Sequence, residues 1–265
     1  MPLGHAVDAA RQPIFNVPVT VLAMVALLGL IHALFVLALS QEETTEVLLL
    51  FAFLPARYDG SFPAGMLPGG WAAGIWTFVT YALIHADLNH LIFNLLWLVA
   101  FGTPVARRFG PLRFIAFFVA TAAAGAVAHL VTHFGEVLPM IGASAAISGA
   151  MAAAMRFAFQ PGGPLGRPRS RDESAYRVPA APLVTMLRDP RLLAFMVVWF
   201  GVNLLFGLGA VTLPGVEQSI AWEGHIGGFL AGLLGFSLFD PVRHSPALDD
   251  PQDPNQEPNG ASMDH

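Results

Sequence analysis

Six separate apolar stretches constrain this chain more than any other feature of its sequence. A helix needs about 20 apolar residues to cross the hydrocarbon core of a bilayer. Only 12% of the 265 residues are charged, whereas soluble proteins usually carry about 25%. We therefore predict an all-α, polytopic membrane protein with six transmembrane helices. The expected spans are residues 19–39, 76–101, 112–132, 140–159, 192–211 and 222–239.

The arginine residues indicate how these helices cross the membrane. All 13 basic residues are arginines, and Arg57 alone falls on the side opposite the two termini. Cytoplasmic loops carry the excess of basic residues, so we expect both termini in the cytoplasm. The expected regions are a cytoplasmic segment (1–18), a helical core (19–240) with an outer loop (41–75) and a cytoplasmic loop (160–191), and a disordered acidic tail (241–265).

Two apolar segments need a separate interpretation. The first span is longer than the apolar core of a signal peptide, about 7–15 residues, and no convincing cleavage site follows it, so we expect it to be retained. Residues 48–54, inside the outer loop, are too few to cross a bilayer. We expect this segment to lie in the membrane interface.

Composition excludes several classes of function. The chain has no cysteine, which rules out disulfides, thiolate catalysis and zinc–thiolate sites. No basic surface suited to nucleic acid is evident, so we expect none as a partner. No internal repeat is evident either, which argues against a transporter built from inverted repeats.

A serine and a histidine occupy membrane segments in which a polar side chain is costly to bury. Ser144 begins the fourth span after Gly142, and His225 lies near the outer end of the sixth. A hydroxyl and a base at the same depth are the minimum for nucleophilic catalysis. The free N–H groups of the first helical turn can bind an oxyanion, and Gly142 permits a tight turn. Taken singly, Ser144 would be a helix cap and His225 an interhelical hydrogen-bonding residue.

Small residues indicate how the serine and histidine helices meet. Gly228 and Gly232 form a GxxxG step just after His225, which lets another helix approach closely. The fourth span offers a matching surface of small residues, and this packing should bring Ser144 and His225 within hydrogen-bonding distance. That surface consists of Ala145, Ala146, Ser148, Gly149, Ala152 and Ala153.

The second span adds further polar side chains. His90 and Asn94 are four residues apart, on one helix face, and both can donate hydrogen bonds to an oxyanion. Interhelical hydrogen bonding is the alternative, above all for His85 and Asn89. A metal site of His85, Asp87 and His90 is disfavoured because His85 and His90, five apart, diverge around the helix. We expect neither a metal nor a cofactor.

Together these residues resemble the rhomboid family of intramembrane serine proteases. The resemblance rests on His85-x4-His90-x3-Asn94, Gly142-x-Ser144 and His225-x2-Gly228-x3-Gly232. It implies a six-helix rhomboid bundle of the bacterial type in the inner membrane, whose substrates are single-span or polytopic membrane proteins cleaved near their outer ends. It also implies Ser144 as nucleophile, His225 as general base, and Asn94, His90 and the Ser144 N–H as the oxyanion hole, without metal or cofactor.

Three positions depart from the family pattern. The Trp-Arg pair of the first outer loop is Trp76-Thr77 here, and Ala145 follows the nucleophile in place of glycine. Ser148 replaces an aromatic residue that stacks on the catalytic histidine, and its hydroxyl is a candidate hydrogen-bond partner of His225. These departures leave one main alternative, a catalytically inactive rhomboid-like protein that binds membrane clients. A small transporter or channel is the other, but its polar residues would continue into the inner leaflet.

Overall fold

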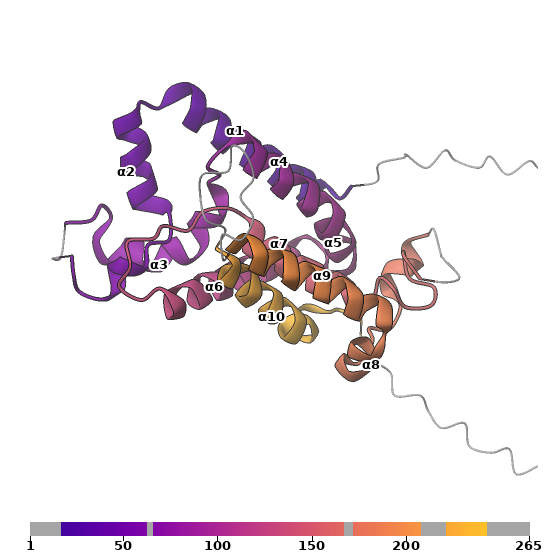
Figure 1. Ribbon diagram of the computed structural model, residues 1–265. Coiled ribbons are helices and arrows are strands. Elements are labelled where there is room, and N and C mark those ends of the chain that lie inside the picture. The colour runs from indigo at the N-terminus through magenta and orange to yellow at the C-terminus, as the bar shows by residue number, and fades with distance from the viewer. Residues whose placement is uncertain (1–16, 63–65, 167–171, 208–220, 243–265) are drawn as a thin grey trace, which may run out of the picture.

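A computed structural model describes residues 17–62, 66–166, 172–207 and 221–242. Every regular element in these ranges is helical, which confirms the all-α prediction. The longer helices are arranged side by side, and α2 and α3 extend away from them at one end (Figure 1). The α-helices are α1 (Val19–Ala38), α2 (Gln41–Phe51), α3 (Gly70–Thr80), α4 (Leu88–Trp97), α5 (Thr103–Phe109), α6 (Pro111–Thr132), α7 (Ser144–Met155), α8 (Leu183–Arg188), α9 (Pro190–Gly207) and α10 (Trp222–Phe239).

Helix α7 forms the centre of the bundle, because its side chains are small enough to be covered on every side. Of its 12 residues only Ser144 is not buried. The helix is mainly alanine, with a glycine, serines and two methionines. Helices α6 and α10 pack closely against it. Its glycine, alanine and serine residues let the neighbouring helices approach its backbone closely.

Within the described residues, three helices are long and apolar enough to cross a membrane: Val19–Ala38, Leu88–Phe109 and Pro111–Thr132. The first and third agree with the predicted spans to within a residue. Residues 190–205 and Ser144–Met155 form shorter apolar helices, and α10 has the bounds predicted for the sixth span. Residues 208–211 of the fifth predicted span lie outside the described residues. The count of six spans stays a prediction.

The predicted bounds of the second span are wrong. The chain leaves the helical conformation at Ile84, and Asp87 caps a new helix by accepting a hydrogen bond from the His90 amide. That helix runs from Leu88 through a π-helical turn (Leu98–Gly102) to Phe109. Such a turn accommodates Pro104, which lacks the amide hydrogen that a regular helix requires. Hydropathy alone could not separate α3 from α4, since both are apolar.

The fourth predicted span is too long at both ends. Helix α7 begins only at Ser144, because Met140 pairs with Phe53 in an isolated antiparallel bridge. Their two backbone hydrogen bonds measure 3.1 and 2.8 Å. The chain then turns at Gly142, whose φ is +109°. After Met155 the chain continues in turns. The short α7 therefore places its first turn inside the protein.

The C-terminal end of residues 48–54 is covered by protein, and the interfacial position of this segment stays a prediction. Phe53 is fully buried and packs against the rings of Tyr58, Phe78 and Tyr81, with centroids 5.6, 4.9 and 6.4 Å away. Arg57 fixes the same loop by donating to the carbonyls of Leu49, Pro68 and Gly70. The outer loop is thus folded onto the core.

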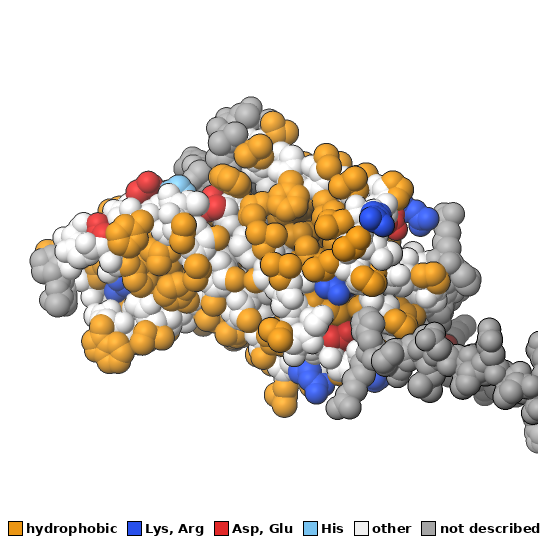
Figure 2. Space-filling view, turned by 90° about the horizontal axis from the view of Figure 1, so that it is seen from below, with side chains coloured by type: hydrophobic (Ala, Val, Ile, Leu, Met, Phe, Trp, Pro, Cys, Tyr) orange, Lys and Arg blue, Asp and Glu red, His pale blue; other side chains and the backbone are white. Residues whose placement is uncertain are grey.

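Apolar side chains also cover much of the molecular surface. Large exposed hydrophobic residues are found on α1, α6, α9 and α10, such as Leu37 (84%), Leu112 (81%) and Leu238 (85%). In Figure 2 hydrophobic side chains cover much of the face in view, and most of the blue arginine side chains visible there lie toward the end that holds α8 in Figure 1. An apolar surface of this extent suits contact with lipid. The N-terminal segment 1–16 and the tail 243–265, including its predicted disorder, lie outside the described residues.

At the end of the bundle opposite Ser144, a buried arginine connects several segments of the chain. Arg108 is 2% exposed and makes two 2.8 Å bonds to the carboxylate of Asp240. Its other nitrogen donates to the carbonyls of Tyr176 and Val178. Bidentate pairing satisfies a guanidinium that would be very costly to bury alone. This contact ties α5, α10 and the 160–191 loop together.

Candidate active site

Ser144 and His225 come together at the start of α7. The Oγ of Ser144 lies 2.7 Å from the Nε2 of His225, a hydrogen-bonding distance. The two residues belong to different helices, 81 positions apart in the chain. Both are partly buried. A serine hydroxyl bonded to an imidazole nitrogen is the arrangement from which the base can accept the hydroxyl proton.

Asn203, on α9, is a third member of this arrangement that the sequence analysis missed. Its Oδ1 lies 2.5 Å from the Nδ1 of His225, and its Nδ2 donates to the Trp199 carbonyl at 2.7 Å. Because the carbonyl can only accept, Nδ2 must face Trp199 and Oδ1 must face the histidine. Oδ1 also only accepts, so the hydrogen of neutral His225 is on Nδ1. Its Nε2 is thereby free to accept the Ser144 proton.

A signal for Asn203 was present in the sequence. It is an amide within the apolar stretch of α9 that follows Arg191, and it is 8% exposed. Such residues are costly in a membrane helix unless they have a partner. The sequence could not reveal that this partner is His225, because no pattern in the chain records how α9 is rotated against α10.

Glycine residues set the distance between the serine and histidine helices. A Cβ added to Gly228 would lie 2.0 Å from the Ala145 carbonyl oxygen, and one added to Gly232 would lie 2.3 Å from the Gly149 carbonyl oxygen. Neither position tolerates a larger residue without displacement of α10. This confirms the predicted packing of the GxxxG step against the small residues of α7.

Two histidines, His85 and His90, lie against the turn that precedes Ser144. The Ala143 amide donates to His85 Nε2 at 3.5 Å. His90 Nε2 lies 2.6 Å from the position that a Cβ on Gly142 would occupy, and the Ser144 Oγ lies 3.8 Å from that same position. Gly142 therefore serves two purposes: its positive φ makes the predicted tight turn, and it leaves room for the His90 ring.

Asn94 is buried one turn further along α4. Its Nδ2 donates to the His90 carbonyl at 2.8 Å, and its buried Oδ1 has no hydrogen-bond partner among the described residues. An amide nitrogen carries two hydrogens, so one N–H remains for another acceptor. The amides of Ser144 and its neighbours in the first turn of α7 likewise have no carbonyl in a preceding turn.

The residues that depart from the family pattern have partners of their own. The Ser148 hydroxyl donates to the Ser144 carbonyl at 2.8 Å, so the suggested bond from Ser148 to His225 is wrong. Thr77 donates to the Ala73 carbonyl, and the Trp76 indole to the Leu50 carbonyl. Asp87, considered as a metal ligand, serves as the α4 cap.

Similarity to known proteins covers the part of the chain that holds these residues. The family model described as Rhomboid domain matches residues 72–240, which include every residue of the site. A curated protein, RHOMBOID-like protein 12, mitochondrial, of Arabidopsis thaliana, is 39% identical over 57 residues. That alignment covers 22% of this chain and 17% of the plant protein. The chain thus matches less than a fifth of the length of this relative.

Proposed function

This chain belongs to the rhomboid family, and from that premise we propose that it is an intramembrane serine endopeptidase. The observation that carries the proposal is the 2.7 Å contact of Ser144 Oγ with His225 Nε2, in a histidine whose Nδ1 is bonded to Asn203. A structural serine would need no such oriented base. The family and the apolar helices indicate a multi-pass membrane protein, so the proposed substrates are transmembrane segments of other proteins.

In the first step His225 Nε2 takes the proton from Ser144 Oγ. The oxygen attacks a peptide carbonyl carbon, a C–O bond forms, and negative charge develops on the carbonyl oxygen. When the tetrahedral intermediate collapses, the C–N bond breaks and His225 gives its proton to the leaving amine. In the second step His225 takes a proton from water, which attacks the acyl-enzyme ester and releases the new carboxyl end. The proton then returns to Ser144.

The oxyanion is proposed to bind at the start of α7. The N–H of Ser144, the remaining N–H of Asn94 and the ring of His90 are the candidate donors. Preorganised donors of this kind typically contribute about 3–4 kcal/mol each to the lowering of the barrier. The positive end of the α7 dipole adds to the effect.

Asn203 is proposed as a positioning residue. Family members stack an aromatic side chain on the histidine from the position occupied here by Ser148, and Ser148 is engaged elsewhere. The bond from His225 Nδ1 to Asn203 replaces that support with a directional one. It also makes the catalytic base dependent on α9, whose outward face is apolar at Val197 and Val198. We infer that α9 forms one wall of the substrate path.

We further propose that cleavage occurs near the outer ends of substrate segments. Ser144 and Arg156 lie at opposite ends of α7, and the Arg108 guanidinium lies over the Phe157 ring just beyond the second end. The positive-inside rule places the arginine end in the cytoplasm. A helix that must be opened for attack is weakened by glycine, so substrates with glycine at the cleavage point should react faster.

Labelling with a fluorophosphonate probe tests the proposal without knowledge of the substrate. We expect the wild-type chain to be labelled, and Ser144→Ala and His225→Ala to lose the label. Ser148→Ala is the matched control, since it removes a hydroxyl one turn away on the same helix. Cleavage of a generic transmembrane substrate should follow the same order.

A folded wild-type chain that takes no label in detergent or in bilayers would overturn the proposal. The inactive, client-binding alternative would then be favoured. Co-purification of intact transmembrane segments with the chain, unchanged by Ser144→Ala, would support this alternative directly.

A further inference from the structure

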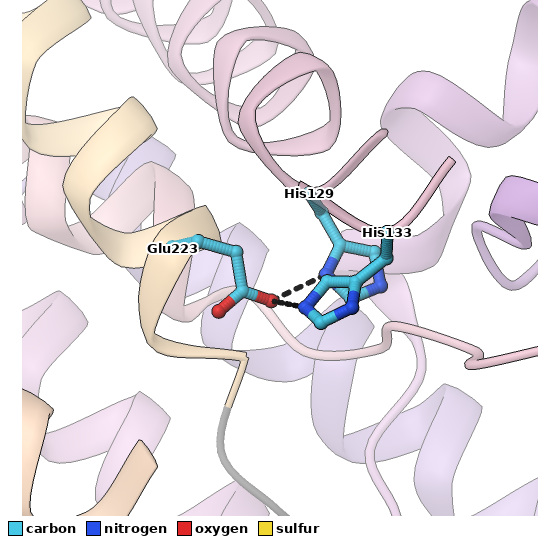
Figure 3. A group of neighbouring side chains, drawn as sticks. All are labelled: His129, His133 and Glu223. Atoms are coloured by element: carbon cyan, nitrogen blue, oxygen red, sulfur yellow. Dashed lines mark hydrogen bonds and ion pairs between the residues drawn. The ribbon is translucent and has the colours of Figure 1, made fainter. Parts of the chain in front are cut away.

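A second group of polar side chains lies on the other side of α10 from Asn203. Glu223, in the first turn of α10, faces His129 and His133 at the end of α6 (Figure 3). Its Oε1 lies 2.6 Å from His129 Nδ1 and 3.1 Å from His133 Nε2. The three ligand atoms lie within 4.8 Å of one another. None of these residues takes part in the proposed catalysis.

In each histidine the ring nitrogen that faces away from Glu223 makes a hydrogen bond, and this bond fixes which nitrogen carries the lone pair. His129 Nε2 lies 3.1 Å from the Leu138 carbonyl, which only accepts, so this nitrogen carries the hydrogen. His133 Nδ1 similarly donates to the Glu136 carboxylate at 3.0 Å. In the neutral rings the other two nitrogens therefore present lone pairs to Glu223.

Three acceptors thus converge on one point. Glu223 and His129 are buried, with 5% and 1% of their surfaces exposed. A carboxylate oxygen and two lone pairs repel one another unless positive charge lies between them. Zinc sites typically combine histidine and acidic ligands. The ring nitrogen of each histidine that does not face the metal usually donates a hydrogen bond to a carbonyl or a carboxylate, as both do here.

We propose that His129 Nδ1, His133 Nε2 and the Glu223 carboxylate bind a divalent transition-metal ion of the Zn²⁺ class. Zn–N and Zn–O bonds of about 2.0–2.2 Å set tetrahedral ligand atoms about 3.3 Å apart. The two contacts of Glu223 Oε1 with the histidine nitrogens, 2.6 and 3.1 Å, are shorter than this, so the carboxylate would have to move away from the rings to admit the ion. Imidazole and carboxylate ligands suit Zn²⁺, and the fourth position remains open toward the partly exposed His133.

Such an ion would join α6 to α10 two residues before His225. The contact of these helices is already close here, since a Cβ on Gly125 would lie 2.9 Å from the Gly224 carbonyl oxygen. A metal bond at this point would stabilise the first turn of α10. Metal binding should therefore raise the thermal midpoint of the folded chain, because it favours the folded over the unfolded state.

The test is a Zn²⁺ titration of the full chain, stripped of metal, in detergent against a chromophoric chelator. It is done in the Ser144→Ala background, so that the result does not depend on protease activity. We expect one tightly bound Zn²⁺ per chain and a rise in thermal midpoint. His133→Ala and Glu223→Gln should each weaken binding at least 100-fold, and Glu136→Gln about 10- to 100-fold through the outer bond.

Glu42→Gln is the matched control, since it removes an exposed carboxylate on α2, outside the cluster. It should leave affinity unchanged. Absence of stoichiometric Zn²⁺ binding to the Ser144→Ala chain would overturn the proposal. So would binding that His133→Ala and Glu223→Gln leave intact in chains that keep their helical circular dichroism.

Discussion

The two ends of α7 bury polar groups in opposite ways. At its start Ser144, His225 and Asn203 form a chain of hydrogen bonds between neutral groups. Just beyond its end Arg156 donates to the carbonyls of Ala181 and Leu233, while Arg108 pairs with Asp240. The groups at the first end can transfer a proton between them. The arginines at the second end keep their charge, and each is bonded to a carboxylate or to backbone carbonyls.

The difference follows from what each group must do. A guanidinium stays protonated at any accessible pH, so it makes strong, permanent bonds but cannot serve as a base. An imidazole can gain and lose a proton, provided that its partners fix which nitrogen is free. We infer that the arginine end gives the bundle its stability and that the histidine end gives it reactivity. The following variants test that division.

The largest expected effect is on stability at the arginine end. Arg108→Leu leaves the buried Asp240 carboxylate without its partner, which should lower the free energy of unfolding by about 3–5 kcal/mol. Thermal denaturation in detergent, followed by circular dichroism, measures the loss. The double variant Arg108→Leu/Asp240→Leu should recover much of it. If Arg108→Leu unfolds at the same temperature as the wild type, the Arg108–Asp240 pair does not stabilise the fold, and the arginine end is not the source of its stability.

The contact between α7 and α10 is the next test, because it connects the two ends. Gly228→Ala puts a Cβ 2.0 Å from a backbone oxygen and should cost about 3 kcal/mol, the upper range for overpacking. It should also slow labelling of Ser144, since α10 carries His225. The control is Gly235→Ala, where nothing lies within 4 Å. That change should be neutral or stabilise the helix by about 0.5–1 kcal/mol.

A smaller effect, on activity alone, is expected at Asn203. Asn203→Ala removes a bond to the imidazolium that forms in the transition state, worth about 1.5–3 kcal/mol. This corresponds to a fall in kcat of about 10- to 150-fold. KM and the thermal midpoint should change little. Asn89→Ala, at an exposed amide on α4, serves as control. Equal losses of activity and stability would instead make Asn203 a packing residue.

The smallest effect is expected at Ser148. Its hydroxyl donates to the carbonyl of Ser144 within the helix, so Ser148→Ala should change kcat by less than about threefold, as expected for a neutral hydrogen bond of about 0.5 kcal/mol. Rates of probe labelling give the comparison. A loss as large as that of Asn203→Ala would mean that Ser148 helps to hold the histidine.

Much of the helical core could be predicted from the sequence. Hydropathy placed α1, α6 and α10 almost to the residue, since long apolar runs have few alternatives in a bilayer. It failed in the second span, where Asp87 begins a new helix inside an apolar region. Nor could hydropathy show that Phe53 is covered by other side chains, because an apolar segment too short to span can be buried by protein as well as by lipid.

The sequence by itself determined the helical class, the small-residue contact of α7 with α10 and the nearness of Ser144 to His225. These follow from local composition and from glycine spacing, which act through neighbouring atoms. Only the tertiary structure decided which side chains complete each site. Asn203 reaches His225 from 22 positions away, and Glu223 reaches His129 from 94. Such partners depend on how separate helices are rotated against each other, and no periodicity in the chain records that rotation.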